Sequence, residues 1–235
     1  ICTVEEIISG PTGSSSEGIS LTDTVIRFTE PIPDEVQEWQ FVAENITDTP
    51  EVEIRRNTFK QIPTRGILVT TRKPVLIEEN VFEGTSMAAI YISCDAQSWY
   101  ESGRVEDVTI QNNKFYRCQG NGVIFIEPTN PNVSVDSTVH KNIQITGNEF
   151  YQSGSKVVDA KSVDGITIEG NRIFRFEPNV DLALTLNGET AQECTISVGE
   201  GLQAEVKSSA SQLDNDLYSF NGCLLYTSPS PRDMR

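Results

Sequence analysis

Histidine is scarce in this chain, and its cysteines form no motif. Among 235 residues there are one histidine, His140, and five cysteines, with no Cys-x-x-Cys pair and no Cys/His cluster. These absences exclude the usual structural zinc sites, and an odd number of widely spaced cysteines argues against a disulfide framework. We therefore expect no metal and no cofactor. Cys94 and Cys118 are interpreted as buried thiols that pack as small apolar side chains, and His140 is expected to be solvated.

Basic charge and long apolar runs are also lacking. The chain has 18 lysines and arginines against 34 aspartates and glutamates, a formal net charge of −16. Such a surface disfavours nucleic acid and anionic membranes as partners, because both are bound through basic patches. No apolar run approaches the roughly 18 residues of a membrane span. The first residues, ICTVEEIISG, show neither an initiator methionine nor a signal peptide, so we expect the true N-terminus to lie outside this sequence.

Helical periodicity is absent, and a short β-type segment recurs instead. Its pattern is an alternating apolar pair, a polar pair, an Asn, one variable residue, and then Phe or Ile. The copies are VEIRRNTF (52–59), VLIEENVF (75–82), VTIQNNKF (108–115), IQITGNEF (143–150) and ITIEGNRI (166–173). Second apolar tracts or weaker echoes follow them: GILVTT (66–71), AIYISC (89–94), GVIFIE (122–127), KVVDA (156–160) and VDLALTL (180–186). One copy cannot bury its apolar residues alone, but stacked copies share a core. The repeat therefore predicts an all-β chain, a right-handed parallel β-helix of about five coils with flanking partial β modules.

The recurring Asn and Phe positions are given structural roles. The asparagines are Asn57, Asn80, Asn113, Asn148 and Asn171, spaced by 23, 33, 35 and 23 residues. We expect each Asn to occupy a turn, where it tolerates left-handed backbone angles, and its amide to bond the Asn of the next coil in a ladder. The Phe two residues later is expected to stack inside the coils.

Changes in composition divide the chain. Residues 1–45 alternate between apolar and polar residues and are broken by GPTGSSSEG and EPIPDE, which predicts a partial, barrel-like β module. Residues 46–188 form the predicted β-helix, which would be the catalytic domain, and residues 189–222 form a further β-rich segment. The last residues, CLLYTSPSPRDMR (223–235), resemble the translation of a sequencing adapter. We interpret them as a disordered artefact and exclude them from the fold.

Two insertions mark where chemistry would lie. AQSWYESGRVED (96–107) and PTNPNVSVDSTVHK (128–141) both follow the second apolar tract, in consecutive coils. Insertions within repeats tend to line the binding face. Asp95 and Glu127 stand at their roots, at +15 and +14 from the ladder Asn, where coil one has Thr71 and Arg72. Stacked strands about 4.8 Å apart would place the two carboxyls roughly 5–10 Å apart. That range includes the about 6.5–9.5 Å of inverting glycosidases and the about 5–5.5 Å of retaining ones.

The alternative is that Asp95 and Glu127 are ordinary acidic residues at the corners of the coils. Asp159 and Asp164 of coil four are further candidates for catalytic acids. In the first insertion Trp99, Tyr100 and Glu101 join aromatic rings to an acid, a combination that suits sugars; alternatively the rings pack the loop onto its coil. Arg65, Arg72 and Thr71 of coil one are expected to contact substrate hydroxyls or, for the arginines, to pair with a carboxylate.

A family resemblance adds to this interpretation. TPEVEIRRNTF, RGILVTTRKPVLIEENVF and MAAIYISCDAQSWYESGRVEDVTIQNNKF resemble glycoside hydrolase family 110, the α-1,3-galactosidases, over about residues 45–175. The resemblance implies a β-helix with smaller β-barrel modules, inverting hydrolysis without a metal, and terminal α-1,3-linked galactose as substrate, as in blood group B or linear glycans. It implies that Asp95 and Glu127 occupy the positions of active-site acids in the family. Where this chain has Cys94 and Asp95, the family often has two consecutive acids. If the missing acid is the general acid or base, the Cys94 thiol replaces it poorly, and the chain is then expected to be a weak, altered or inactive member.

The residues and the family resemblance leave three candidate functions. The first is an exo-acting α-1,3-galactosidase with a carbohydrate substrate, secreted or periplasmic by resemblance. The second is a β-helix polysaccharide lyase, which would need a Lys or Arg base and often Ca²⁺; the inserted face lacks a basic cluster. The third is a surface protein that binds glycans without catalysis, which uniform coils without insertions would favour.

Overall fold

The computed structural model describes residues 1–14, 20–37, 41–95, 102–130, 136–152, 156–175, 218–221 and 224–225. The chain divides into two units, Ile1–Ala43 and Glu44–Arg235. In the described part of the first unit, β1 (Val4–Ser14) and β2 (Ser20–Phe28) pair antiparallel as a hairpin. No helix long and apolar enough to cross a membrane occurs among the residues described.

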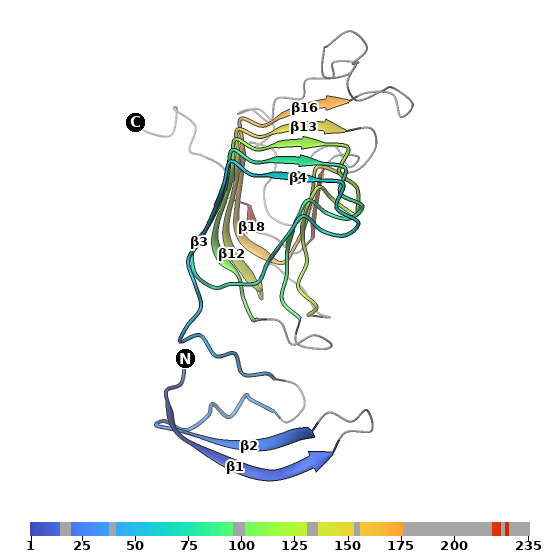
Figure 1. Ribbon diagram of the computed structural model, residues 1–235. Coiled ribbons are helices and arrows are strands. Elements are labelled where there is room, and N and C mark those ends of the chain that lie inside the picture. Colours follow the sequence, from blue (N-terminus) through green and yellow to red (C-terminus); the bar gives the residue numbers. More distant parts are fainter. Residues whose placement is uncertain are drawn as a thin grey trace, which may run out of the picture. The chain divides into compact units, whose positions relative to one another are not determined.

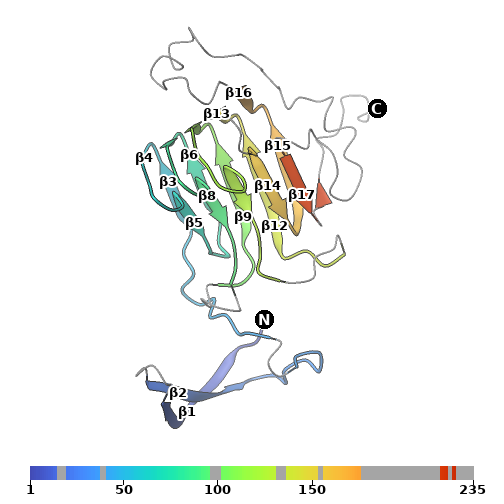
Figure 2. The same ribbon diagram turned by 90° about the vertical axis from the view of Figure 1, so that its right-hand side faces the viewer.

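The second unit is a right-handed parallel β-helix, as the repeat predicts. Its strands recur in threes, one per coil in each of three parallel sheets (Figures 1 and 2). Sheet I holds β3 (Val52–Arg55), β6 (Val75–Glu78), β9 (Glu106–Gln111), β12 (His140–Thr146), β15 (Val163–Glu169) and β18 (Leu224–Leu225). Sheet II holds β4 (Thr58–Lys60), β7 (Val81–Glu83), β10 (Lys114–Tyr116), β13 (Glu149–Gln152) and β16 (Arg172–Arg175). Sheet III holds β5 (Ile67–Val69), β8 (Ile90–Ile92), β11 (Ile124–Ile126), β14 (Val158–Lys161) and β17 (Tyr218–Asn221).

Columns of identical or similar apolar residues fill the interior. In sheet I the register aligns Ile54, Ile77, Ile110, Ile145 and Ile168. Alternate side chains of a strand point to opposite faces, so these residues turn inward while their neighbours face outward. The phenylalanines form a second column on sheet II. The ring centroids of Phe59, Phe82, Phe115 and Phe150 are 4.7, 5.0 and 4.7 Å apart, and buried Ile173 takes the fifth place. The predicted internal stack is confirmed.

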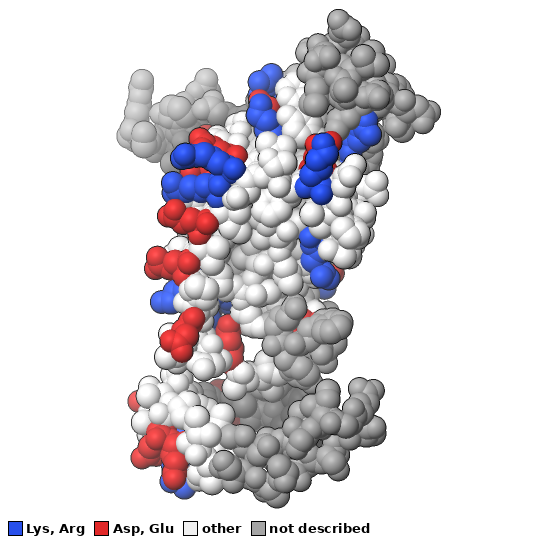
Figure 3. Space-filling model, in the orientation of Figure 1, with Lys and Arg blue, Asp and Glu red and all other residues white. Residues whose placement is uncertain are grey.

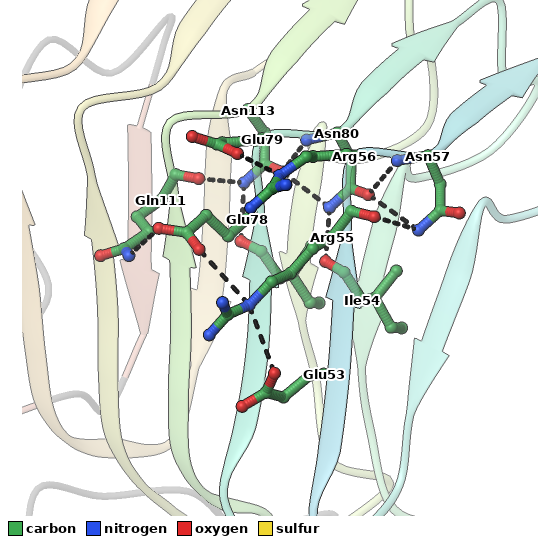
Figure 4. A network of polar contacts seen from close by, with 11 residues as sticks. Glu53, Ile54, Arg55, Arg56, Asn57, Glu78, Glu79, Asn80, Gln111 and Asn113 are labelled. Atoms are coloured by element: carbon green, nitrogen blue, oxygen red, sulfur yellow. Dashed lines mark hydrogen bonds and ion pairs between the residues drawn. The ribbon is translucent and has the colours of Figure 1, made fainter.

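The asparagine ladder is present and directional. Each of the first four Asn residues donates from its backbone N–H and its Nδ2 to Oδ1 of the Asn in the next coil, at 2.9 and 3.3 Å from Asn57 and at 2.9–3.0 Å from Asn80, Asn113 and Asn148. Figure 4 shows its first three members beside a network of charged corner residues. Except for exposed Asn57, the ladder residues are buried, so the ladder satisfies amides that would otherwise lie unpaired in the core.

The expected left-handed backbone angle falls one residue earlier than predicted. The residue before each ladder Asn has the positive φ: Arg56, Glu79, Asn112, Gly147 and Gly170, at 54–63°. The Asn itself is therefore not the turn residue. Its side chain instead bonds the coils across the corner that its predecessor makes.

The fifth coil closes differently from the sequence expectation. The tract VDLALTL (180–186) lies outside the described residues, and the strand that pairs with β14 is β17, in register from Val158↔Tyr218 to Lys161↔Asn221. Beyond it, β18 pairs with β15. Its two leucines belong to the stretch interpreted as adapter-derived.

Charged side chains lie outside the coils. On the face drawn in Figure 3 they gather along the margins of the coil stack, with few between. Many bridge neighbouring coils, as in Arg56–Glu79 at 2.8 Å and Lys60–Glu83 at 3.0 Å. Exposed pairs of this kind contribute little stability each, so the interior columns dominate.

Candidate functional site

Three neighbouring strands of sheet III bring the principal candidates to one edge. Thr71 and Arg72 follow β5, Asp95 follows β8 and Glu127 follows β11, and these strands are consecutive in the sheet. Parallel strands end at the same edge, so the coil stack gathers these residues from positions 56 residues apart in sequence. The described ends of both insertions leave the coils at this edge.

The two acids are offset along the sheet by two residues. Ile90 and Ile92 lie opposite Ile124 and Ile126, and the pairing continues because Glu127 N–H donates to the Ile92 carbonyl at 3.0 Å and Thr129 N–H to that of Cys94 at 3.2 Å. Glu127 thus lies opposite Ser93, and Asp95 opposite Thr129. Strand rise and strand spacing then give a Cα separation of about 8 Å.

Counting from the ladder Asn hides this offset. Ile90 is ten residues after Asn80, whereas its partner Ile124 is eleven after Asn113. The extra residue in coil three shifts the register. Asp95 at +15 and Glu127 at +14 are therefore offset by two residue positions along the paired strands rather than by one.

The surroundings of the two acids differ. Asp95 is 8% exposed, and the side chain of Glu127 is 41% exposed. Lys161, directly opposite Glu127 on β14, places Nζ 3.7 Å from Glu127 Oε1. The Ser93 hydroxyl donates to the Glu127 carbonyl at 2.8 Å, which fixes the backbone. One acid is enclosed while the other faces solvent beside a cation.

Cys94 is buried as predicted, and so is Cys118. Burial raises the pKa of the Cys94 thiol; the backbone of Thr129 opposes this, and the charges of Asp95 and Glu44 raise it further. The group is therefore a neutral thiol, and it cannot serve as the carboxylic acid that the family resemblance implies for this position.

Arg72 and Thr71 are engaged with the protein itself. Arg72 Nη2 donates to Glu44 Oε2 at 2.8 Å, which is the carboxylate pairing that was one of the two expectations for this arginine. The Thr71 hydroxyl donates to the Pro50 carbonyl at 2.9 Å. Glu44 was not anticipated, because it precedes the first repeat and no periodicity points to it. Its contacts cross as many as 58 residues.

Arg65 lies before β5, at the other end of the strand, with its guanidinium carbon 5.3 Å from the Tyr91 ring centroid. Tyr91 stacks in turn on Phe125 at 5.1 Å. Because the arginine and the second ring cover the two faces of Tyr91, this ring offers its edge rather than a face for sugar stacking.

The remaining candidates separate into two groups. Trp99, Tyr100 and Glu101 lie outside the described residues. Asp159 lies on β14 of sheet III, 3.3 Å from Lys156 Nζ, whereas Asp164 lies on β15 of sheet I, 4.0 Å from Lys141 Nζ. Asp159 thus shares a sheet with the two acids and Asp164 does not.

The expectation that His140 is solvated is wrong. Its side chain is fully buried at the start of β12, where Nδ1 accepts the Val105 N–H at 3.2 Å and Nε2 has no hydrogen-bond partner. Burial lowers its pKa to about 4. The second insertion ends at the coil interior rather than at the surface, which reverses the expectation.

In the described part of the chain, no group of three or more His, Cys, Asp or Glu side chains is placed to hold a metal ion.

Comparison with known proteins supports the resemblance. Residues 43–134 match a family model described as a right-handed β-helix region. Alpha-1,3-galactosidase A of Streptomyces avermitilis is 48% identical over 170 residues, 72% of this chain and 27% of that protein. The protein of the same name from Peterkaempfera griseoplana is 40% identical over 222 residues, 92% of this chain and 29% of that protein. That from Bacteroides thetaiotaomicron is 44% identical over 155 residues, 65% of this chain and 27% of that protein. The chain thus spans between a quarter and a third of these relatives, and it belongs to their family, the α-1,3-galactosidases of glycoside hydrolase family 110.

Proposed function

We propose that the chain is the β-helical catalytic part of an exo-acting α-1,3-galactosidase that removes terminal galactose from glycans of the blood group B or linear type. The observation that carries the proposal is the identity of 40–48% to proteins named alpha-1,3-galactosidase. The proposed location is secreted or periplasmic, where such glycans are accessible.

Asp95 and Glu127 are the proposed acid and base. One carboxyl group donates its proton to the glycosidic oxygen as the bond from that oxygen to C1 breaks. The other, as a carboxylate, takes a proton from the water that attacks C1 from the opposite face. With Cα atoms about 8 Å apart, the two side chains have the reach to place their carboxyl groups at the about 6.5–9.5 Å of inverting enzymes, which leaves room for that water. The proposed product is therefore β-galactose.

The test replaces each acid by its amide. Asp95→Asn and Glu127→Gln remove the proton-transfer groups while keeping their shapes, and each is expected to lower kcat on an α-1,3-linked galactose disaccharide by about 10²–10⁴-fold. Circular dichroism and the unfolding temperature serve as controls. Full activity in either variant, or loss of the fold, would exclude that residue from the proposed role.

Three further readouts separate the alternatives. Proton NMR of the first product reports its anomer, and initial α-galactose would contradict inversion. Activity is expected to persist in EDTA. An unsaturated product from a uronic-acid polysaccharide would instead support a lyase, and galactoside binding without release would support a glycan-binding protein.

A further inference from the structure

A carboxylate that precedes the coils joins the corner of coil one to the end of the first insertion. Glu44 Oε2 accepts a hydrogen bond from Arg72 Nη2 at 2.8 Å, and Oε1 accepts one from the Ser102 hydroxyl at 2.6 Å. The backbone of Gly103 bonds the same carboxylate. We call Glu44, Arg72, Ser102 and Gly103 the Glu44 clamp.

The clamp is enclosed and tightly fitted. The side chains of Glu44 and Arg72 are only 16% and 25% exposed. A Cβ added to Gly103 would lie 2.6 Å from Glu44 Oε2 and 3.3 Å from Arg72 Nη2. Residue 103 is therefore small where the carboxylate approaches its backbone. Such a semi-buried, doubly bonded ion pair restrains geometry far more than an exposed one.

The clamp lies beside the proposed acid. The first insertion leaves the coil directly after Asp95 and returns through Ser102 and Gly103 to β9. The charges of Asp95 and Glu44 both raise the pKa of the Cys94 thiol, in addition to burial. With both oxygens bonded to protein, Glu44 is suited to hold structure rather than to transfer protons.

We infer that Glu44 is a positioning residue of the candidate site: it fastens the returning end of the first insertion to Arg72 and so holds that end at the edge of sheet III where Asp95 lies. This inference rests on the proposed function for its kinetic readout, and its structural part is measured separately.

Two substitutions break the clamp from opposite sides in the whole chain. Glu44→Gln removes the charge that pairs with Arg72. Gly103→Ala keeps that charge but displaces the flexible end of the Glu44 side chain. The matched control is Glu79→Gln, which removes the glutamate of an ion pair of equal length, 2.8 Å from Arg56, but at an exposed corner outside the site.

Hydrogen exchange at the amides of residues 102–105 and hydrolysis of p-nitrophenyl α-galactoside are measured for each. Both clamp variants are expected to exchange faster there and to lower kcat/KM on the order of 10- to 100-fold, mainly through KM. Glu79→Gln is expected to match the parent in both. Unchanged exchange, or faster exchange with unchanged kcat/KM, would overturn the inference.

A parent chain that hydrolyses no galactoside would defeat the proposed function but not the clamp. Exchange and the affinity for an α-1,3-linked galactose disaccharide, measured by calorimetry, would then decide. Weaker binding in both clamp variants supports the inference, and equal binding refutes it.

Discussion

Cys94, after β8, and His140, at the start of β12, are buried residues whose protonation the fold constrains. Cys94 is a buried neutral thiol whose pKa is raised mainly by burial, at a position where the family resemblance implies an acid. His140 joins the ends of both insertions, since its ring accepts the N–H of Val105. Each leads to a prediction about a single side chain.

Cys94→Asp is expected to increase activity. A carboxyl beside Asp95 would restore the pair of consecutive acids and add a further proton-transfer group next to Asp95 and Glu127, so we expect kcat on the galactose disaccharide to rise by about tenfold or more. Because the site is enclosed, the unfolding temperature should fall at the same time. Cys94→Ser is the control for a polar group without a titrating proton. Equal activities of the Asp and Ser variants would show that the second acid has no role.

His140 is expected to make the protein acid-sensitive. Its pKa is lowered from 6.5 to about 4 in the folded chain, so the unfolded chain takes up the proton first as the pH falls. Stability from this residue is thus complete above about pH 6.5 and is lost as the pH falls toward 4, by at most about 3 kcal/mol.

Denaturant unfolding at neutral and at mildly acidic pH measures this effect. His140→Asn keeps an acceptor for the Val105 N–H but does not titrate, so its loss of stability on acidification should be smaller than that of the parent. Glu44 also contributes to the pH dependence of the unfolding free energy. The effect of His140 is therefore the difference between the parent and the His140→Asn variant in the stability lost on acidification. Burial disfavours the charged form of Glu44 but is outweighed by hydrogen bonds from Ser102, Gly103 and Arg72, which lower its pKa. Identical pH profiles would contradict the assignment to His140.

At the scale of the strand and turn, each coil repeats one construction. A left-handed residue makes the corner, the next Asn bonds to the neighbouring coil, and a Phe or Ile two residues on fills the interior. Arg56, Glu79 and Asn112 adopt positive φ where the last two coils have glycine. A positive φ is energetically unfavourable for residues with a Cβ. The ladder hydrogen bonds of the next residue stabilise the corner conformation at these three positions.

The ladder predicts a strong dependence on position. Asn113→Ala would remove Oδ1, the acceptor for both the N–H and the Nδ2 of buried Asn80, and should lower the free energy of unfolding by about 3 kcal/mol, because buried donors are left unpaired. Asn57→Ala removes only a donor at the exposed end and should cost less than about 1 kcal/mol. Urea denaturation distinguishes them, and similar losses for both would argue against a cooperative ladder.

At the scale of the whole molecule, the net negative charge disfavours anionic ligands. With 34 acidic against 18 basic residues, the surface repels anions over distances comparable to the Debye length. A neutral glycan approaches without this penalty.

The net negative charge predicts a preference for neutral over anionic galactosides, and salt should weaken this preference. For an α-galactoside carrying a nearby sulfate, we expect a higher KM than for its neutral counterpart at low ionic strength, and the gap should narrow at high ionic strength because the repulsion is screened. Steady-state kinetics on the pair at both salt concentrations measure this. A gap independent of salt would point to a steric cause instead.

The repeat by itself determined the architecture. Alternating apolar residues, a fixed Asn and a Phe or Ile two residues later recur in each coil, and such local periodicity specifies which face of each strand is buried and which coil stacks on which. The burial of Cys94 and Cys118, the Phe column and the gathering of Asp95, Glu127, Thr71 and Arg72 at one edge all follow from that regularity.

Only the tertiary structure decided what the repeat does not encode. One extra residue in coil three shifts Glu127 to a position opposite Ser93, the left-handed angle falls on the residue before the Asn, and His140 turns inward. Glu44 meets Ser102 across 58 residues. These features depend on loop lengths and on contacts between segments outside the repeat, and so no period in the sequence could reveal them.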